Sequence, residues 1–313
     1  MAERVAIIGA GIAGLATAHR LRAAGLACTL FDKGRRIGGR MATRQAGDLA
    51  FDHGAQYFTA KGPSFSAMVA RWRAAGLAAE WFAGAFVGTA SMAAPLAAMA
   101  AGFPCIGARA ATALRRDSAG WTVLGAEGPF EAADNGRFDA VVLAMPAPQI
   151  VPLAATAGLA FPALTAVRYA PCWALMLAYD APPGPAYDHL RPEDEAIGWI
   201  ARDAAKPGRD REAETWVVHA APAWSRRHLE LAPEAAGAAL RAEAARFGLG
   251  AAPRVAIAHR WRFARVEQAA AVPFVWDAAA GLGACGDWGL GPRVEAAFDS
   301  GEALAAAMLA APR

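Results

Sequence analysis

Glycines near the start of the chain stand at the spacing that a phosphate-binding turn requires: Gly9, Gly11 and Gly14. They follow the apolar run 5–8, which we expect to be a buried parallel strand. The first glycine allows a tight turn, the second lets the backbone approach a pyrophosphate, and the third lets helix and strand pack closely. Ile12 and Ala13 open the helix that follows, where free N–H groups and the helix dipole favour phosphate.

An acidic residue closes the next expected strand, 28–31, at the position where a ribose would lie. The Asp32 carboxylate can accept hydrogen bonds from ribose hydroxyls, and we place Lys33 beside it in the same site. Strand, glycine turn, helix, strand and acid form the order of a βαβ dinucleotide unit. A glycine turn that binds nothing is the alternative, and the acid and the flanking elements argue against it.

A second glycine motif, the doublet Gly38-Gly39, follows Asp32 and continues directly into Arg40 and Met41. Arg40 would meet phosphate as a forked, permanently charged donor. The segment resembles the motif shared by flavoproteins of the amine oxidase and phytoene desaturase superfamily. That resemblance implies FAD rather than NAD as the tightly held cofactor. A basic surface loop is the alternative interpretation.

The far end of the chain carries a second motif of the same superfamily. An expected strand, 282–285, ends in Gly286-Asp287, and Pro292 suits a first helical position with Gly291 as the cap. The resemblance implies that Asp287 bonds the ribityl chain and that the helix N-terminus points at the flavin, where its dipole favours the reduced form. We assign three residues of this helix start to the cofactor site: Arg293, Val294 and Glu295.

Composition narrows the class of protein. The 313 residues suit two interleaved domains, and the hydrophobic fraction of 56% is inflated by alanine. A formal charge of +3 is too small to argue for nucleic acid. The four cysteines lack metal-ligand spacing, so we expect no metal and free thiols in a reducing compartment. Met1 leaves no room for a signal peptide before the first strand, so we expect a cytoplasmic protein.

Two charge-free stretches, 81–108 and 140–167, have to be weighed as membrane spans. Both consist largely of alanine and contain several prolines, which would break a lipid-exposed helix. We therefore expect no membrane partner.

The predicted fold class is α/β. A FAD-binding Rossmann-type domain, of the p-hydroxybenzoate hydroxylase or amine oxidase kind, is interleaved with a substrate domain built on an antiparallel sheet. We assign 1–60, 103–150 and 268–313 to the FAD domain, and 61–102 and 151–267 to the substrate domain. The predicted sheet strands are 169–179, 197–203, 215–220 and 255–263, with helices at 64–76, 91–101 and 233–247. In the FAD domain we expect edge strands at 108–114 and 120–124 and a buried strand at 138–145.

Central segments carry a closer resemblance, to the bacterial renalase-like proteins. The segments are 51–58, 199–203, 206–209, 216–220, 259–264 and 286–288. The resemblance implies that Ala55, Gln56 and Tyr57 pass over the flavin, and related folds suggest backbone contacts from Ala110 to the adenine. It implies a noncovalent FAD oxidase that oxidises dihydro isomers of NAD(P) to NAD(P)⁺ and passes the electrons to O₂, which gives H₂O₂.

Hydride transfer from a dihydropyridine needs proximity and orientation but no protein base. Amine oxidation often uses a lysine near the flavin. Here Lys61 follows the segment over the flavin and is a candidate, although we favour a surface role for it. Lys206 lies in a Pro-Gly loop. Cys285 does not stand at a recognisable flavin attachment site, so we expect noncovalent FAD.

Candidate substrate residues come from aromatic and basic side chains. Tyr57, Trp261 and Trp288 could wall a flat ring, although each could equally be core. Arg202 and His219 lie on strands of the expected cavity floor, where an arginine would suit a phosphate or a carboxamide. A structural salt bridge and a structural histidine are the alternatives. Our leading hypothesis is the dihydropyridine oxidase; an amine oxidase or desaturase, and a non-catalytic FAD-binding protein, remain alternatives.

Overall fold

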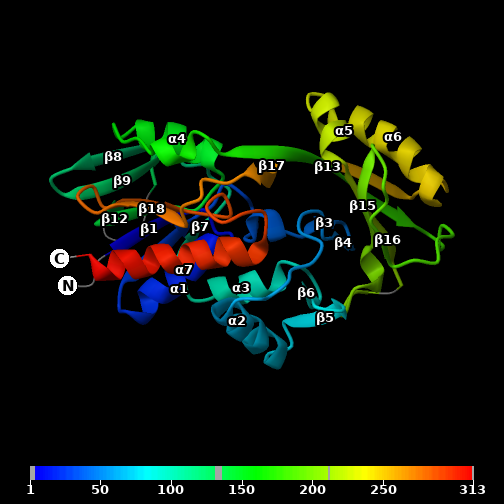
Figure 1. The fold of residues 1–313 in the computed structure, drawn as a ribbon, viewed down its shortest axis with the longest axis horizontal. Helices are drawn as coiled ribbons and strands as arrows, with labels where there is room; N and C mark the ends of the chain where they lie inside the picture. Colours follow the sequence, from blue (N-terminus) through cyan, green and yellow to red (C-terminus); the bar gives the residue numbers. More distant parts are fainter. Residues whose placement is uncertain (1–3, 131–135, 211, 312–313) are drawn as a thin grey trace.

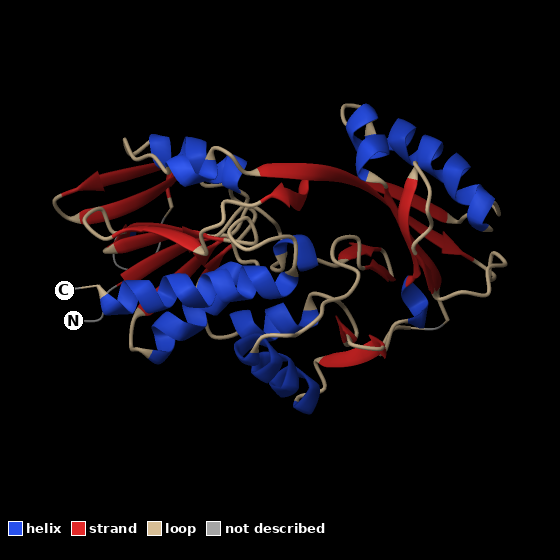
Figure 2. Cartoon of the chain, in the orientation of Figure 1, coloured by secondary structure: helices blue, strands red, loops and turns tan. Residues whose placement is uncertain are grey.

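The computed structural model describes residues 4–130, 136–210 and 212–311. Figure 1 shows two lobes, one built around a mostly parallel sheet and one around an antiparallel sheet. Two long strands, β13 (Arg168–Tyr179) and β17 (Val255–Gln268), connect the lobes. Helices cover the outer surfaces, and the loops concentrate between the two sheets (Figure 2).

The first sheet is a Rossmann-type sheet with the strand order β18-β19-β12-β1-β2-β7. All neighbouring pairs are parallel except β18 with β19. The central strands are apolar along their length because helices and a second sheet bury both of their faces. The strands are β1 (Arg4–Ile8), β2 (Ala27–Phe31), β7 (Cys105–Ile106), β12 (Ala140–Leu143), β18 (Phe274–Asp277) and β19 (Leu282–Cys285).

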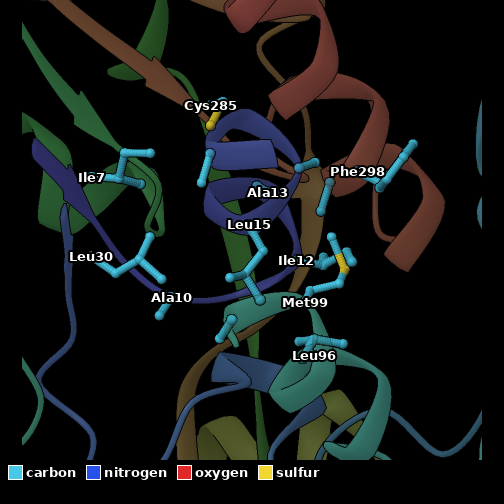
Figure 3. Close-up of a cluster of buried hydrophobic side chains, with 14 of the residues drawn as sticks. Ile7, Ala10, Ile12, Ala13, Leu15, Leu30, Leu96, Met99, Cys285 and Phe298 are labelled. Carbon is cyan, nitrogen blue, oxygen red and sulfur yellow. The ribbon is translucent and has the colours of Figure 1, made fainter. Parts of the chain in front are cut away.

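A layer of helices covers one face of this sheet. Figure 3 shows its core, in which apolar side chains of the first helix meet Leu96, Met99 and Phe298. The first and last helices approach closely at Gly301, where a Cβ would lie 2.2 Å from the Ala13 carbonyl oxygen. The helices are α1 (Ile12–Ala23), α2 (Pro63–Ala74), α3 (Ala94–Ala100) and α7 (Val294–Ala310).

The opposite face is covered by a helix and a small antiparallel sheet. Trp121 and Phe138 of that sheet pack with Phe31 and Leu143 of the central strands. The covering elements are α4 (Ala147–Ala155), β8 (Ala113–Asp117), β9 (Gly120–Gly125), β10 (Gly128–Pro129) and β11 (Arg137–Phe138).

The second large sheet is antiparallel throughout, with the order β14-β15-β16-β13-β17. Helices α5 (Pro222–Arg227) and α6 (Pro233–Ala244) cover one face of it. Part of the other face packs on Leu49 and Phe51. The remaining strands are β14 (His189–Leu190), β15 (Ile197–Arg202) and β16 (Glu214–Ala220).

Short elements complete the fold between and beside the lobes. Two hairpins are formed by β3 (Arg44–Ala46) with β4 (Leu49–Phe51) and by β5 (Ala78–Phe82) with β6 (Ala85–Gly88). The 3₁₀ turns are η1 (Gly39–Met41), η3 (Pro162–Leu164), η4 (Asp203–Ala205) and η5 (Ala245–Phe247).

The predicted fold class is confirmed, with local corrections. The expected strand 138–145 is divided: Arg137–Phe138 pairs with β9 in the small sheet, and only Ala140–Leu143 belongs to the Rossmann-type sheet. The expected strand at 108–114 begins only at Ala113, since Ala108 has a left-handed φ of 61°. Arg293, not Gly291, is the N-cap of the last helix, which starts at Val294. The predicted helix 233–247 ends its α-helical part at Ala244 and closes with a 3₁₀ turn.

We keep the division into domains as a proposal. The two large sheets follow it, whereas α2 and α3, which we assigned to the substrate domain, pack against α1 and α7. In the described part of the chain, no helix is long and apolar enough to cross a membrane.

Candidate cofactor and substrate site

The glycine turn after β1 has the geometry that its three glycines predict. Gly9 has a φ of +112°, and a Cβ there would lie 2.2 Å from the Ala144 carbonyl oxygen. A Cβ on Gly14 would lie 2.1 Å from the Gly9 carbonyl oxygen. A Cβ on Gly11 would meet nothing within 4 Å. The first and third glycines therefore serve the fold, and the second borders open space at the start of a helix.

Helix α1 begins at this open space. Its N-cap is Gly11, which supplies no side-chain cap, and the first helical hydrogen bond runs from the Leu15 N–H to the Gly11 carbonyl. The N–H groups of Ile12, Ala13 and Gly14 precede that bond, so no helical carbonyl takes them up. Free donors and the positive dipole end favour a phosphate here.

The end of β2 is held against the glycine turn by Asp32. Its carboxylate accepts from the N–H groups of Ala10, at 2.8 Å, and Gly34, at 2.7 Å. Lys33 is exposed beside it. The segment before the exposed Ala110 lies alongside, because the Ala108 N–H donates to the Gly34 carbonyl at 2.9 Å. The residues predicted for the adenosine end of the cofactor are thus neighbours.

The second glycine doublet lies against the first turn. The Gly38 N–H donates to the Ala10 carbonyl at 3.1 Å, and a Cβ on Gly39 would be 3.5 Å from the Gly11 Cα. The open space is therefore bounded by Gly11 on one side and by Gly39 on the other. Met41 turns inward and is buried in the core beneath.

Arg40 and Asp287 bring the two ends of the chain together. The guanidinium and the carboxylate form two parallel hydrogen bonds of 2.7 Å each, and the Tyr169 ring lies 5.8 Å from the guanidinium carbon. Burial lowers the pKa of Arg40, but Asp287 more than offsets this, so the pKa is raised overall. The pair lies next to the glycine doublet. Contacts of Arg40 with phosphate and of Asp287 with the ribityl chain stay predictions.

The start of α7 fastens the chain that follows the segment 51–58. Glu295 is buried, and its Oε1 accepts from the N–H groups of Lys61, at 2.7 Å, and Gly62, at 2.5 Å. Lys61 itself is exposed, as are Pro292 and Arg293, and Val294 is half-buried. The Glu295 side chain therefore orders this loop, and contact of the helix start with a cofactor stays a prediction.

The segment 51–58 lies directly on the second glycine doublet. The Ala55 N–H donates to the Arg40 carbonyl at 2.8 Å, and a Cβ on Gly54 would be 2.1 Å from that carbonyl oxygen. On its other side, the Trp261 ring would be 3.5 Å from the same Cβ. Ala55, Gln56 and Tyr57 thus stand between the cofactor side and the antiparallel sheet.

One face of the antiparallel sheet packs against the segment 51–58. Trp199, His219 and His259 lie in one row across the strands, with Ala174 between the two histidines. Residues paired across strands point to the same face, and Trp261 shares it because it is two positions from His259. The segment 51–58 contacts this sheet face. The His53 carbonyl accepts a hydrogen bond from Trp261 Nε1 at 2.9 Å and lies 3.1 Å from His219 Nε2.

Tyr57 contacts this row of residues at the end where Trp199 lies. Its ring lies 5.6 Å from that of Trp199 and 5.1 Å from that of Phe82, and its hydroxyl is 3.3 Å from the Arg191 guanidinium. The structure therefore brings together three of the five predicted substrate residues, Tyr57, His219 and Trp261. It adds Trp199, which sequence reasoning missed because its position depends on strand register.

Two predicted substrate residues lie elsewhere. Arg202 pairs with Trp216, which points to the opposite face of the sheet, and its guanidinium forms two bonds to Glu214 of 2.9 and 2.7 Å. The salt-bridge alternative is thus the correct one for Arg202. Trp288 is fully buried in the core between β12, β19 and α4. A packing role replaces the predicted substrate contact.

A buried group of charges was not predicted at all. Lys206 is 1% exposed, with its Nζ 2.5 Å from Asp203 and 3.4 Å from Asp52. Arg209 also pairs with Asp52. Burial raises the pKa of Asp203, whereas Lys206 and Arg209 overcome the effect of burial on Asp52 and lower its pKa to about 2. Lys206, in its Pro-Gly loop, is therefore an internal cation.

Three histidines gather where the segment 51–58 contacts this sheet face. The His53 ring lies 4.8 Å from that of His259 and 5.0 Å from that of Trp261. Burial lowers the pKa of His53 to about 3 and those of His219 and His259 to about 4. All three are neutral at pH 7. Within the described ranges, no group of three or more His, Cys, Asp or Glu residues is placed to hold a metal ion.

The residues present fit FAD. Gly11 and Gly39 leave a space that a Cβ would fill, the start of α1 offers N–H donors to a pyrophosphate, and Asp32 stands at the ribose end. The carboxylate oxygens of Asp32 each accept one backbone hydrogen bond and retain lone pairs for hydroxyls. This cradle offers the donors and the open space that a dinucleotide cofactor such as FAD requires.

Comparison with known proteins agrees with this architecture. Residues 7–72 match the model of a family described as an NAD(P)-binding Rossmann-like domain. Over 67 residues the chain is 36% identical to protoporphyrinogen oxidase 2 of Arabidopsis thaliana. That match covers 21% of this chain and only 13% of the plant protein. The family match and this curated match each cover only about a fifth of the chain.

Solved structures resemble the whole chain. A protein described as a protoporphyrinogen oxidase from Exiguobacterium superposes with a TM-score of 0.74 at 12% identity, over 98% of this chain and 99% of that one. Cyclohexylamine oxidase from Brevibacterium oxydans gives a TM-score of 0.68 at 12% identity, with the same coverage. The chain thus has the fold of these proteins, a domain with a Rossmann-type sheet joined to an antiparallel sheet.

Proposed function

We propose that this chain is a FAD-dependent oxidoreductase, and specifically an oxidase that takes hydride from a dihydropyridine. Isomeric forms of NAD(P)H are the favoured substrate, as the resemblance to renalase-like proteins implies. One observation carries the proposal: the segment 53–57 lies with one side on the cofactor cradle and the other on a sheet face rich in aromatic and neutral imidazole groups.

The residues of the chain bind and orient rather than transfer protons. The α1 N-terminus and the glycine doublet hold the pyrophosphate, and Asp32 holds the ribose. The rings of Trp199, Trp261 and Tyr57 would offer flat apolar surfaces to a substrate ring. When bound, FAD would supply the hydride-accepting and O₂-reducing chemistry that the side chains lack. The balance is NAD(P)H isomer plus O₂ plus H⁺ giving NAD(P)⁺ plus H₂O₂, which requires no protein base at the transferred hydride.

An amine oxidase or desaturase on the same fold is the second candidate. The whole-chain likeness to cyclohexylamine oxidase supports it, as do the aromatic rings of Tyr57 and Trp199 at the site. Against it, Lys206 is engaged in a buried ion pair and Lys61 is exposed. A FAD-binding protein without turnover is the candidate of another class.

Anaerobic titration of the purified yellow protein separates these candidates. We expect an isomerised NAD(P)H mixture to bleach the flavin band through a minor isomer, with ordinary β-NADH slow and amines inert. Fast bleaching by an amine alone would favour the amine oxidase, and no bleaching by any reductant the non-catalytic protein. A colourless protein that takes up no added FAD would contradict the cofactor assignment.

We propose that FAD is held noncovalently. Cys285 is buried beside Thr17, with the two side-chain heteroatoms 3.5 Å apart, and burial raises the pKa of its thiol to about 12. Such a thiol is a poor nucleophile for flavin attachment. Acid precipitation should release the flavin into the supernatant, and yellow colour retained in the pellet would refute this.

A further inference from the structure

A cavity of about 460 Å³ lies beside the two long strands that connect the lobes. The start of β13 and Pro148 of α4 line it from the lobe of the Rossmann-type sheet. Arg226 of α5, Leu229 and Phe263 of β17 line it from the lobe of the antiparallel sheet. In Figure 1, α4 and α5 stand at the two ends of this stretch of β13. A ligand in the cavity would therefore contact both lobes.

The cavity lies on the reverse side of these strands from the proposed substrate site. Cys172 and Trp261 are paired across the two strands, and Trp261 belongs to the face that we propose for the substrate. Pro171 and Arg262 each stand one position away in the chain, so they point to the opposite face. Both of them line the cavity. A ligand bound there would not occupy the substrate site.

Arg168, at the start of β13, supplies hydrogen-bond donors to the cavity. Its Nη1 donates to the carbonyl groups of Thr165, at 2.8 Å, and Val167, at 3.1 Å. A guanidinium group has five N–H bonds. Within the part of the chain that the structure describes, Nε and Nη2 of Arg168 bond to no other group, and no carboxylate pairs with this arginine. Arg168 therefore keeps both its charge and a free edge for an anion.

The other two arginines of the cavity belong to exposed ion pairs. Arg226 pairs with Glu267, and Arg262 forms two hydrogen bonds to Glu230, of 2.7 and 3.0 Å. All four side chains are exposed, and exposed ion pairs of this kind contribute little to stability. Among the described lining residues, none is acidic. Two glutamates for three arginines leave one positive charge uncompensated at the cavity.

The remaining surface of the cavity is apolar. It is formed by rings and aliphatic groups of Pro148, Val167, Pro171, Leu229 and Phe263. Cavities of a few hundred Å³ that combine apolar walls with a few charged groups are typical of small-molecule sites. The cavity can therefore take a ligand that is mostly apolar and carries one negative charge.

We propose that this cavity binds a small organic anion, a flat apolar body with a single carboxylate. The carboxylate bonds to the free edge of Arg168, since the planar guanidinium fork matches the two carboxylate oxygens. Arg226 and Arg262 add positive potential from the other lobe, and the apolar body lies on Leu229 and Phe263. Such a ligand holds the two lobes together from the side opposite the substrate site.

Isothermal titration calorimetry of the full chain, saturated with FAD, tests the class of ligand. The probes are naphthoate, its neutral amide naphthamide, and inorganic phosphate. We expect naphthoate to bind more tightly than naphthamide by about tenfold or more, because only naphthoate can form charged hydrogen bonds to Arg168. Phosphate lacks the apolar body and should bind more weakly than naphthoate. Absence of naphthoate binding, equal affinity for the amide, or tighter binding of phosphate would each refute the proposal.

Variants of two arginines test the location. Arg168→Met should weaken naphthoate binding by about tenfold or more. The matched control is Arg227→Met, which also removes one positive charge but belongs to a different cavity, although it adjoins Arg226 on α5. We expect its affinity to equal that of the wild type. Unchanged binding in Arg168→Met, or an equal loss in both variants, would overturn the assignment.

A second variant tests the same site without removing an arginine. Leu229→Glu adds a carboxylate to the apolar wall, and it should abolish naphthoate binding through repulsion and through pairing with the arginines. Naphthoate bound with wild-type affinity by a folded Leu229→Glu would place the ligand elsewhere and refute the proposal. Calorimetry measures binding alone, so these outcomes are independent of the proposed oxidase activity.

Discussion

At the scale of single residues, the cofactor cradle depends on a few groups with separate tasks. Arg40 and Asp287 neutralise each other beside the glycine doublet, and a bidentate pair of this kind is geometrically strict. Gly9 and Gly14 are required by contacts within the fold, whereas Gly11 has open space around it. These differences predict which substitutions impair the fold and which impair cofactor binding.

Asp287→Ala should weaken FAD retention by about tenfold to a hundredfold, because removal of a charged hydrogen-bond partner costs about 1.5–3 kcal/mol. The measurement is the flavin to protein ratio after dialysis against known FAD concentrations. Glu230→Ala is the matched control, since it breaks a bidentate pair with Arg262 that is exposed. Full FAD occupancy in Asp287→Ala would show that the second motif is misplaced.

Gly11→Ala and Gly14→Ala should separate binding from folding. A methyl on Gly11 meets no protein atom but enters the space assigned to the pyrophosphate, so FAD binding should weaken at least tenfold with unchanged unfolding of the apoprotein. A methyl on Gly14 collides with the Gly9 carbonyl and should lower the free energy of unfolding by about 1–3 kcal/mol. Chemical denaturation of both apoproteins, with FAD titration, checks this. Normal FAD affinity in Gly11→Ala would contradict the cradle.

At the scale of elements, the contact between α1 and α7 joins the first and last helices of the described chain. Gly301 allows the close approach, and the Thr17 hydroxyl lies 3.0 Å from the carbonyl oxygens of both Ala13 and Gly301. The approach places the start of α7 near the cradle, where Glu295 fastens the loop at 61–62. Packing of the two helices therefore also fixes the position of Glu295, which holds this loop.

Gly301→Ala should destabilise the protein by about 1–3 kcal/mol, because its Cβ would overlap the Ala13 carbonyl and push the helices apart. Gly237→Ala in α6 is the control: its Cβ would lie 3.2 Å from the Ala258 methyl, and the gain in helix propensity offsets the tight contact. Urea unfolding of both variants measures the difference. Equal stabilities would mean that the two helices adjust without cost.

At the scale of the whole molecule, two lobes meet across neutral histidines and a compensated set of buried charges. His219 and His259 belong to the sheet of one lobe, and His53 belongs to the segment that lies on the other. Asp52 of that segment pairs with Lys206 and Arg209 of the substrate lobe. Protonation at this junction therefore affects the stability of the whole fold.

Stability should fall as the pH drops from about 6.5 towards 4. The folded pKa values of His53, about 3, and of His219 and His259, about 4, lie below the unfolded value of 6.5. The unfolded chain then binds more protons in this range, and each such histidine removes at most about 1.4 kcal/mol per pH unit. The stabilisation is complete above pH 6.5 and is lost as the pH falls. Urea unfolding at pH 7, 6 and 5 tests this, and His259→Asn should flatten the slope. A flat profile in the wild type would contradict the buried neutral state.

Motifs that act within a short stretch of chain were predictable from the sequence. The turn at Gly9, the acid at Asp32 and the doublet at Gly39 depend on local backbone geometry, which neighbouring residues determine. The strands and helices of both lobes also followed from apolar periodicity. These elements defined the α/β fold class and the proposed place of the cofactor.

The tertiary structure alone decided which side chains share the proposed substrate face of the antiparallel sheet. Successive residues of a strand point to opposite faces, so the pairing register places His219 over the cofactor side and Arg202 on the far side. It also buried Lys206 against Gln56 and paired Arg40 with Asp287, across gaps of 150 and 247 positions. Contacts between such distant segments depend on how whole elements pack together, and no local pattern in the sequence specifies them.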